Sequence, residues 1–339
     1  MTNNVAARMA NERVELWKVL PLETPFTVGL FIGDICNFKC NYCVQSLPED
    51  HPEKKHLVRK FMSYEDCVRV IDSLKLFPNK IKNLTIHGNG EPTLNPDLPR
   101  MIEYASKSNT CERIQIITNG TKLTPELSRK IIDAGLTRII ISIQGVTEEK
   151  YSAISSYNLD MQQFLKQLEY LYQYSRTHGC GCKIHIKTVD VACDEGEDIK
   201  FYEMFKPYAD TIHIDNVMKN YEGVDYSEMI DEEKNSLNGG QIVEVDCCPS
   251  PFFSIYVQAN GDIIPCCIAH QPIVYGNINS TSVYEVWNSD IRDKFLKMQL
   301  HKKRKNNPAC RECGYVYGTF VKEDYLDPYT HDILEKWER

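Results

Sequence analysis

Short hydrophobic runs alternate with longer amphipathic segments along the first two thirds of the chain. The runs are rich in β-branched residues and end in small polar residues, as strands do, whereas the segments between them repeat apolar residues at helical spacing. This alternation predicts parallel βαβ units. The expected strands are residues 27–33, 82–87, 113–118, 138–143, 183–187 and 211–215, and the expected helices are residues 63–76, 102–107, 124–135, 160–175 and 198–205.

Six such units are too few for a full eight-stranded barrel. We therefore expect an α/β fold, a partial (β/α)6 TIM-like barrel, over residues 27–219. An N-terminal extension, residues 1–26, precedes it with a short helix around residues 10–18. Residues 220–240 are polar and rich in Gly and Asn, which predicts a linker to a smaller C-terminal unit, residues 241–339. In parallel βαβ arrangements the functional loops follow the carboxyl ends of the strands.

Composition narrows the class of protein. The chain has 339 residues, 42% of them hydrophobic, and a net charge of −8. Basic residues are scattered except at 301–305, which we interpret as a solvated loop, so nucleic acid is a poor candidate partner. No apolar stretch approaches the roughly 20 residues of a membrane span, and the polar N-terminus lacks a signal-peptide core. We therefore expect a cytoplasmic location with no membrane contact.

Cysteine usage points to metal or redox chemistry. The sequence has 14 cysteines and no export signal, which argues against a disulfide framework. The most specific group is Cys36, Cys40 and Cys43, spaced C-x3-C-x2-C directly after the first expected strand. Three thiolates on one loop can bind three irons of a 4Fe-4S cluster and leave the fourth iron open to a small molecule.

Two other interpretations of this loop remain open. A structural zinc site would need a fourth ligand, and the nearest candidates, His51 and His56, lie in a polar loop with poor spacing. The same cysteine spacing also marks one face of a helix, where the thiols would be buried small residues. Asn37 and Asn41 disfavour that helix.

A second cysteine set lies in the C-terminal third. Asn260-Gly261 predicts a tight hairpin that brings Cys248 and Cys266 together. Cys310 and Cys313 then form a C-x2-C knuckle. Four thiolates close a metal site completely, so a four-cysteine zinc ribbon remains an alternative to an iron-sulfur cluster.

The first cysteine loop, with Tyr42 before its last cysteine, resembles the signature of radical S-adenosylmethionine (SAM) enzymes. In that family a Gly-Gly-Glu-Pro-like turn binds the amino group of SAM. Residues 88–92 match this turn except at Asn89, which implies binding by Gly88, Gly90, Glu91 and Pro92. The resemblance also implies SAM contacts at later strand ends, although each residue also fits an ordinary turn or strand role: Asn119, Ser142 and Lys187.

The second set resembles the SPASM/twitch appendage of the same family. That resemblance implies an auxiliary 4Fe-4S cluster on Cys248, Cys266, Cys310 and Cys313, and a β-hairpin plus helix architecture. Because nothing after Cys313 contributes a thiol, the single-cluster twitch form fits best. Cys247 and Cys267 each adjoin a proposed ligand. Either ligand assignment could shift by one residue, or the spare thiol could donate a hydrogen atom to a product radical.

The resemblance implies a function. An electron donor such as flavodoxin or ferredoxin reduces the cluster. The reduced cluster then splits SAM to a 5'-deoxyadenosyl radical that abstracts hydrogen from the substrate. The main hypothesis is an oxidoreductase or epimerase acting on a small polar molecule, sugar-like or aminocyclitol-like. The alternatives are an enzyme that epimerises or crosslinks ribosomal peptides, and a zinc-binding protein without catalysis.

Overall fold

The computed structural model describes residues 13–230, 237, 242–319 and 321–337. Its centre is a nine-stranded sheet in the order β6-β5-β4-β3-β2-β1-β7-β8-β9. The first six strands pair in parallel in sequence order, and the sheet is not closed, so the predicted partial barrel is confirmed. These strands are β1 (Thr27–Phe31), β2 (Asn83–His87), β3 (Ile114–Thr118), β4 (Arg138–Ser142), β5 (Lys183–Val189) and β6 (Thr211–Asp215).

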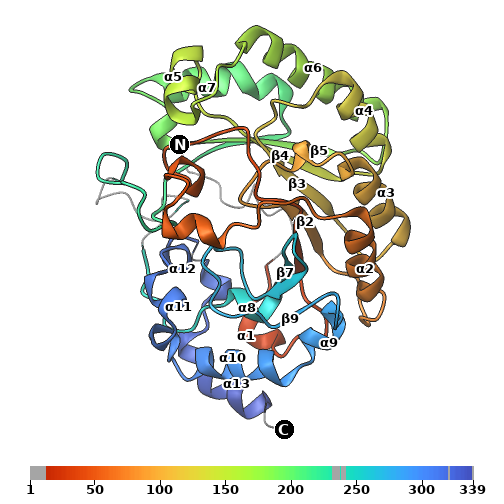
Figure 1. Ribbon diagram of the computed structural model, residues 1–339, viewed down its shortest axis with the longest axis vertical. Helices are drawn as coiled ribbons and strands as arrows, with labels where there is room; N and C mark the ends of the chain where they lie inside the picture. Colours follow the sequence, from red (N-terminus) through yellow and green to blue (C-terminus); the bar gives the residue numbers. More distant parts are fainter. Residues whose placement is uncertain (1–12, 231–236, 238–241, 320, 338–339) are drawn as a thin grey trace.

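Helices connect these strands and lie along the outer side of the curved sheet (Figure 1). Ser63, Thr124 and Asp160 accept hydrogen bonds from backbone N–H groups of the first turns and so fix three helix starts. One helix, α5 (Glu148–Ser155), was not expected, because it is short and weakly amphipathic. The others match the predicted segments: α2 (Tyr64–Leu74), α3 (Leu98–Ser108), α4 (Pro125–Asp133), α6 (Met161–Thr177) and α7 (Glu197–Phe205).

The two faces of the sheet differ in chemistry. Strand register places one set of aliphatic side chains on a single face, where all are almost fully buried: Val28, Leu30, Leu84, Ile86, Ile114, Ile116, Ile139, Ile141, Ile184 and Ile186. The opposite face carries mostly polar groups, with Thr85, His87, Gln115, Ser142, His185, Lys187, His213 and Asp215. Side chains of neighbouring residues in a strand point to opposite faces. The core therefore lies under the helices, and the polar face lines the barrel interior.

The C-terminal unit continues the barrel sheet. Strand β7 (Ser254–Val257) pairs in parallel with β1, and β8 (Asp262–Ile264) returns antiparallel to β7. The predicted Asn260-Gly261 hairpin is confirmed, and Gly261 has a φ of +90°, which favours glycine. The remaining elements are α8 (Ser250–Phe253), β9 (Gly276–Asn277), α9 (Val283–Trp287), α10 (Asp290–Leu300), α11 (Pro308–Glu312), α12 (Tyr315–Gly318) and α13 (Thr330–Trp337).

The N-terminal segment packs on this C-terminal unit. Helix α1 (Leu16–Val19) lies beside α10 and α13 (Figure 1). Leu16 shares a buried apolar cluster with Phe252, Leu296 and Ile333. The helix expected around residues 10–18 thus appears as a shorter one, and residues 10–12 lie outside the described part of the chain.

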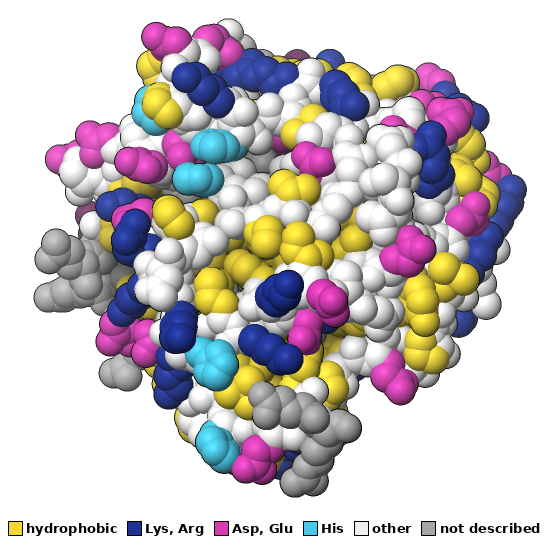
Figure 2. All heavy atoms as spheres, turned by 60° about the horizontal axis from the view of Figure 1, so that its bottom comes forward, with side chains coloured by type: hydrophobic (Ala, Val, Ile, Leu, Met, Phe, Trp, Pro, Cys, Tyr) yellow, Lys and Arg dark blue, Asp and Glu magenta, His cyan; other side chains and the backbone are white. Residues whose placement is uncertain are grey.

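Surface and helix composition give no sign of a membrane span. Among the described residues, no helix is both long and apolar enough to cross a bilayer. Lysine and arginine side chains are interspersed with acidic ones over the face shown in Figure 2. That mixture on this face matches the sequence, in which basic residues are scattered rather than gathered in one tract.

Candidate active site

The first cysteine loop follows β1 in irregular backbone, so its cysteines do not form a helix face. The backbone N–H of Lys39 donates to the carbonyl of Ser155 at 2.8 Å, and that of Asn41 donates to the carbonyl of Ile154 at 2.9 Å. Both acceptors belong to the last turn of α5, where carbonyl groups lack helical partners. The unexpected helix thus holds the loop in place.

Burial makes the three thiols hard to ionise without a metal. It raises the pKa of Cys36 to about 12 and also raises those of Cys40 and Cys43. Negative charge on Cys43 further raises the pKa of both Cys36 and Cys40, so the thiolates would repel one another. Iron ions that replace the protons offset this repulsion with their positive charge. Thiolates are also the ligands that iron-sulfur clusters require. The loop therefore fits a cluster with three protein ligands.

The turn after β2 packs against the start of the cysteine loop. A Cβ on Gly88 would lie 2.5 Å from the carbonyl oxygen of Gly33, and one on Gly90 would lie 2.4 Å from that of Ile35. The backbone N–H of Glu91 donates to the same Ile35 carbonyl at 2.9 Å. Glycine is needed at both positions because the two backbone segments are in contact and leave no room for a Cβ atom.

Glu91 is buried and hydrogen-bonded within the protein. Its carboxylate accepts from the N–H of Asn119 at 2.7 Å, from the hydroxyl of Thr118 at 2.6 Å, and from the N–H and hydroxyl of Thr93 at 2.9 and 2.5 Å. Burial raises its pKa, and these hydrogen bonds oppose the rise. The carboxylate thus joins the end of β2 to the end of β3. A direct contact of Glu91 with SAM stays a prediction.

Asn119 extends this network to the cysteine loop. Its side-chain amide donates to Asn37 Oδ1 at 2.8 Å, and Asn37 Nδ2 donates to Thr121 Oγ1 at 3.0 Å. The two strand-end turns and the cluster loop therefore form one hydrogen-bonded unit. The structure joins Asn119 to Glu91 and to Asn37 of the cysteine loop, and a contact of Asn119 with SAM stays a prediction.

Tyr42 and the ends of the later strands enclose the barrel interior. The hydroxyl of Tyr42 donates to Gln144 Oε1 just beyond β4. Lys187 lies beside Ser142 in the strand register, and its ammonium group is 3.0 Å from the carboxylate of Asp215, which is fully buried. Sequence reasoning missed Gln144 and Asp215, although both follow or end predicted strands, where functional side chains gather.

The second set of cysteines lines one hollow. Cys248, Cys266, Cys310 and Cys313 all line it, and burial raises the pKa of each thiol. Four thiols that line one hollow fit a cluster with complete protein ligation.

Arg304 compensates the charge of this thiol group. Its side chain is 1% exposed, lines the same hollow, and donates to the carbonyls of Val245 and Cys310. The guanidinium charge lowers the pKa of Cys248, Cys310 and Cys313, although burial dominates. Buried charges are normally paired. Sequence reasoning missed this arginine because it lies within the basic run 301–305, which looked like a solvated loop.

The two spare thiols have different surroundings. Cys247 is fully buried in the apolar cluster with Phe252 and Leu296, and its N–H donates to Asp327. Cys267 is outside that cluster. Burial raises its pKa to about 11, against hydrogen bonds with Tyr315 and Tyr256. Tyr256 pairs in register with Gly29 on the polar face of the sheet, so its hydrogen bond links Cys267 to that face, whereas Cys247 lies in the apolar cluster.

This geometry defines an iron-sulfur protein with a partial α/β barrel and two separate thiol sets. Family models agree: the model of the radical SAM superfamily matches residues 30–190, and that of an iron-sulfur cluster-binding domain, SPASM, matches residues 247–314. The chain belongs to the radical SAM enzyme superfamily and carries a C-terminal SPASM-type domain. These two domains imply a 4Fe-4S cluster, an auxiliary iron-sulfur cluster and SAM as cofactors.

Curated relatives resemble only part of the chain. The GTP 3',8-cyclase of Staphylococcus saprophyticus subsp. saprophyticus is 25% identical over 216 residues, which cover 60% of this chain and 58% of the relative. That of Aeromonas hydrophila subsp. hydrophila is 32% identical over 146 residues, 41% of each chain. The matches thus span less than two thirds of these relatives.

Solved structures resemble the fold over most of its length. SuiB of Streptococcus suis bound to S-adenosylmethionine has a TM-score of 0.63 at 15% identity, covering 93% of this chain and 79% of SuiB. BtrN in complex with AdoMet and 2-DOIA has a TM-score of 0.54 at 16% identity, covering 88% of this chain and 97% of BtrN. At such identities the likeness concerns the fold.

Proposed function

We propose that the chain is a radical SAM oxidoreductase or epimerase acting on a small polar, sugar-like or aminocyclitol-like molecule. The observation that supports this proposal is the polar interior face of the sheet. Its carboxyl end carries Lys187 and Asp215 in an ion pair, with His213 Nε2 3.6 Å from Asp215. Such groups can hydrogen-bond to hydroxyl and amino substituents of a polar substrate.

Tyr221 marks where the substrate would lie. Burial raises its pKa well above the usual range, and charge on the thiolates of Cys43 and Cys267 adds to the rise. Its hydroxyl donates to Asn89 Oδ1 at 3.4 Å. Because both cysteine groups contribute to this shift, we propose that the reaction space lies between them. This residue belongs to the segment expected to be a linker.

The chemistry divides between cofactors and chain. When bound, the reduced cluster and SAM supply the 5'-deoxyadenosyl radical that removes a hydrogen atom. Glu91 and Asn119 hold the strand-end turns that would bind SAM, and Lys187 would orient the substrate. Residues 248, 266, 310 and 313 would hold one auxiliary cluster, the twitch arrangement. A flavodoxin-like or ferredoxin-like protein would provide the electron.

Cys267 is the candidate hydrogen donor of the epimerase version. Its S–H bond would break and a C–H bond would form on the substrate radical, leaving a thiyl radical. One electron from the donor protein and one proton from solvent would then restore the thiol. In the dehydrogenase version the substrate radical instead loses a proton to solvent and an electron, which the auxiliary cluster held by Cys248, Cys266, Cys310 and Cys313 would accept, and Cys267 takes no part.

Turnover in deuterated water separates the two versions, because thiol protons exchange with solvent. We expect the epimerised product to carry one non-exchangeable deuterium, measured by mass spectrometry. Cys267→Ala should abolish this incorporation while 5'-deoxyadenosine is still formed. Cys247→Ala, a matched change away from the barrel interior, should leave it intact. An oxidised product without deuterium in the unaltered enzyme would exclude Cys267 as donor and favour dehydrogenation.

The comparisons suggest which substrates to test. The curated relatives are named for GTP cyclisation. Among solved structures of similar fold, SuiB and anSMEcpe are each bound to a peptide. Aminocyclitols, sugar nucleotides, GTP and short peptides should therefore be compared as stimulants of 5'-deoxyadenosine formation. Strong stimulation by peptides alone would overturn the small-molecule proposal and favour peptide modification.

A further inference from the structure

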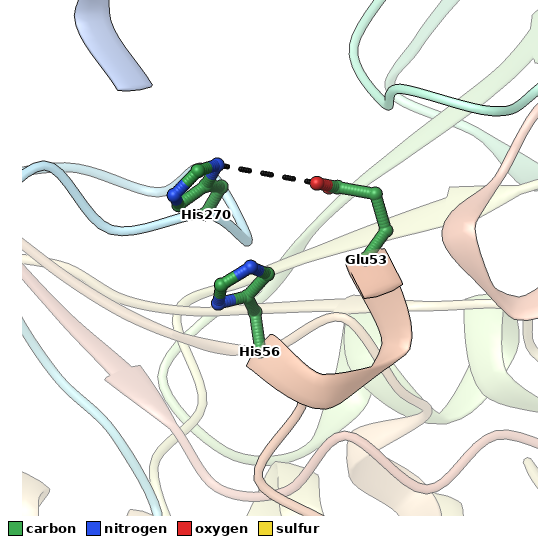
Figure 3. A group of neighbouring side chains, drawn as sticks. All are labelled: Glu53, His56 and His270. Carbon is green, nitrogen blue, oxygen red and sulfur yellow. Dashed lines mark ion pairs between the residues drawn. The ribbon is translucent and has the colours of Figure 1, made fainter. Parts of the chain in front are cut away.

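Three potential metal ligands meet outside both cysteine sets. Glu53 and His56 lie on the short 3-10 helix Pro52–His56, and His270 lies on the loop after β8. Their side chains point toward one another from the two sides of a gap (Figure 3). All the potential ligand atoms lie within 4.8 Å of one another. None of the three serves either cluster.

The Glu53 carboxylate is the buried member of this group. Its side chain is 9% exposed, and its nearest cationic partner is His270 Nδ1 at 4.0 Å. That distance is too long for a hydrogen bond. Among the described residues no donor hydrogen-bonds to this carboxylate. Its oxygens are therefore not occupied by donors and can bind a cation, for which a carboxylate is a good ligand.

The two imidazole rings belong to the same group. They stack with centroids 4.3 Å apart and planes 13° from parallel. A neutral imidazole nitrogen is a common ligand of transition metals. Two imidazoles and one carboxylate form a common donor set for zinc and other divalent transition metals.

The ligands are held by a buried junction between core and C-terminal unit. Their neighbours Leu57 and Ala269 belong to one apolar cluster, the junction cluster: Val44, Leu47, Leu57, Val217, Val224, Tyr226 and Ala269. Ala269 is two residues beyond Cys267, and Val44 directly follows Cys43. The His51 side chain lies outside the donor set, and its Nδ1 accepts from the N–H of Glu53.

We propose that Glu53, His56 and His270 form a third metal site, which binds one divalent transition-metal ion, zinc by preference. The bound ion would connect the helix Pro52–His56, which follows the cysteine loop, to the loop after Cys267. A closure of the side chains by about 1 Å would bring the donors to zinc-ligand spacing. His56 and His270 are exposed and free to make that adjustment. One or more coordination positions remain open to water.

Zinc titration of the anaerobic holoenzyme, with both clusters in place, tests this site. We expect one equivalent of Zn²⁺ to bind, measured by calorimetry and by elemental analysis after dialysis, with iron content unchanged. His56→Ala and His270→Ala should each weaken this binding by at least about 10-fold. Zn²⁺ should raise the unfolding temperature of the unaltered protein but not that of the double variant, since only the native state holds the three ligands together.

A matched control is available on α13. His331 and Glu335 form a surface pair at 3.5 Å with no second imidazole, so His331→Ala should bind zinc like the unaltered enzyme. Equal zinc binding by the His56→Ala, His270→Ala and unaltered proteins would place the zinc on free thiols and overturn the proposal. Absence of tight binding by the unaltered holoenzyme would also overturn it, leaving only a Glu53–His270 ion pair.

Discussion

Replacing Cys40 by serine is expected to abolish formation of 5'-deoxyadenosine and to remove one of the two clusters. Cys40 is buried between Cys36 and Cys43, and burial and both neighbouring charges raise its pKa. A serine hydroxyl there would not ionise, so only two thiolates would remain for the cluster. Anaerobically purified variant should hold about four irons per chain instead of about eight, measured by iron and sulfide analysis.

Cys111→Ser is the matched control for this change. Cys111 is also partly buried, with a pKa raised to about 11 by burial, but it lies in no cysteine group. Its replacement should leave iron content and 5'-deoxyadenosine formation unchanged. A Cys40→Ser enzyme that still produces 5'-deoxyadenosine at the normal rate would show that the loop does not hold the SAM-binding cluster.

Replacing Glu91 by glutamine is expected to weaken both SAM binding and the fold, even though the side chains have nearly equal volume. The carboxylate accepts hydrogen bonds on both oxygens, from Asn119, Thr118 and Thr93. Glutamine puts an NH₂ group where one oxygen was, opposite N–H or O–H donors. Each buried donor left without an acceptor costs about 1–3 kcal/mol.

The loss of hydrogen bonds at Glu91 should also weaken the position of the cysteine loop, because the Asn119 side chain donates to Asn37 in that loop. Urea denaturation should show the lower free energy of unfolding, and equilibrium binding should show at least about a tenfold lower affinity for SAM, the equivalent of 1.4 kcal/mol. Glu126→Gln, an exposed carboxylate paired with Lys130, should change neither. Unaltered SAM affinity in Glu91→Gln would mean that this network does not shape the SAM site.

Local sequence patterns were sufficient to predict most of the fold. The six strands, the helix caps at Ser63 and Thr124, and the Asn260-Gly261 hairpin depend on neighbouring residues, and each forms as expected. The cysteine spacing likewise reports a local loop. Helix α5 escaped prediction because its periodicity is weak, and its importance lies in a distant contact with that loop.

Long-range contacts could not be derived in the same way. Nothing in residues 254–257 indicates that this strand would pair with β1 and continue the barrel sheet. The same holds for the ion pair of Lys187 with Asp215, and for Tyr221 of the predicted linker, whose hydroxyl donates to Asn89 in the turn after β2. Pairings between segments far apart in sequence depend on the complete packing rather than on local spacing.

The most direct measurement is the iron and sulfide content of anaerobically purified protein, combined with electron paramagnetic resonance of its reduced form with and without SAM. Two 4Fe-4S clusters predict about eight irons and two signals. SAM should change one signal, from the cluster on Cys36, Cys40 and Cys43, and leave the other unchanged. A colourless protein that holds zinc and fewer than about four irons would contradict the assignment of both cysteine sets.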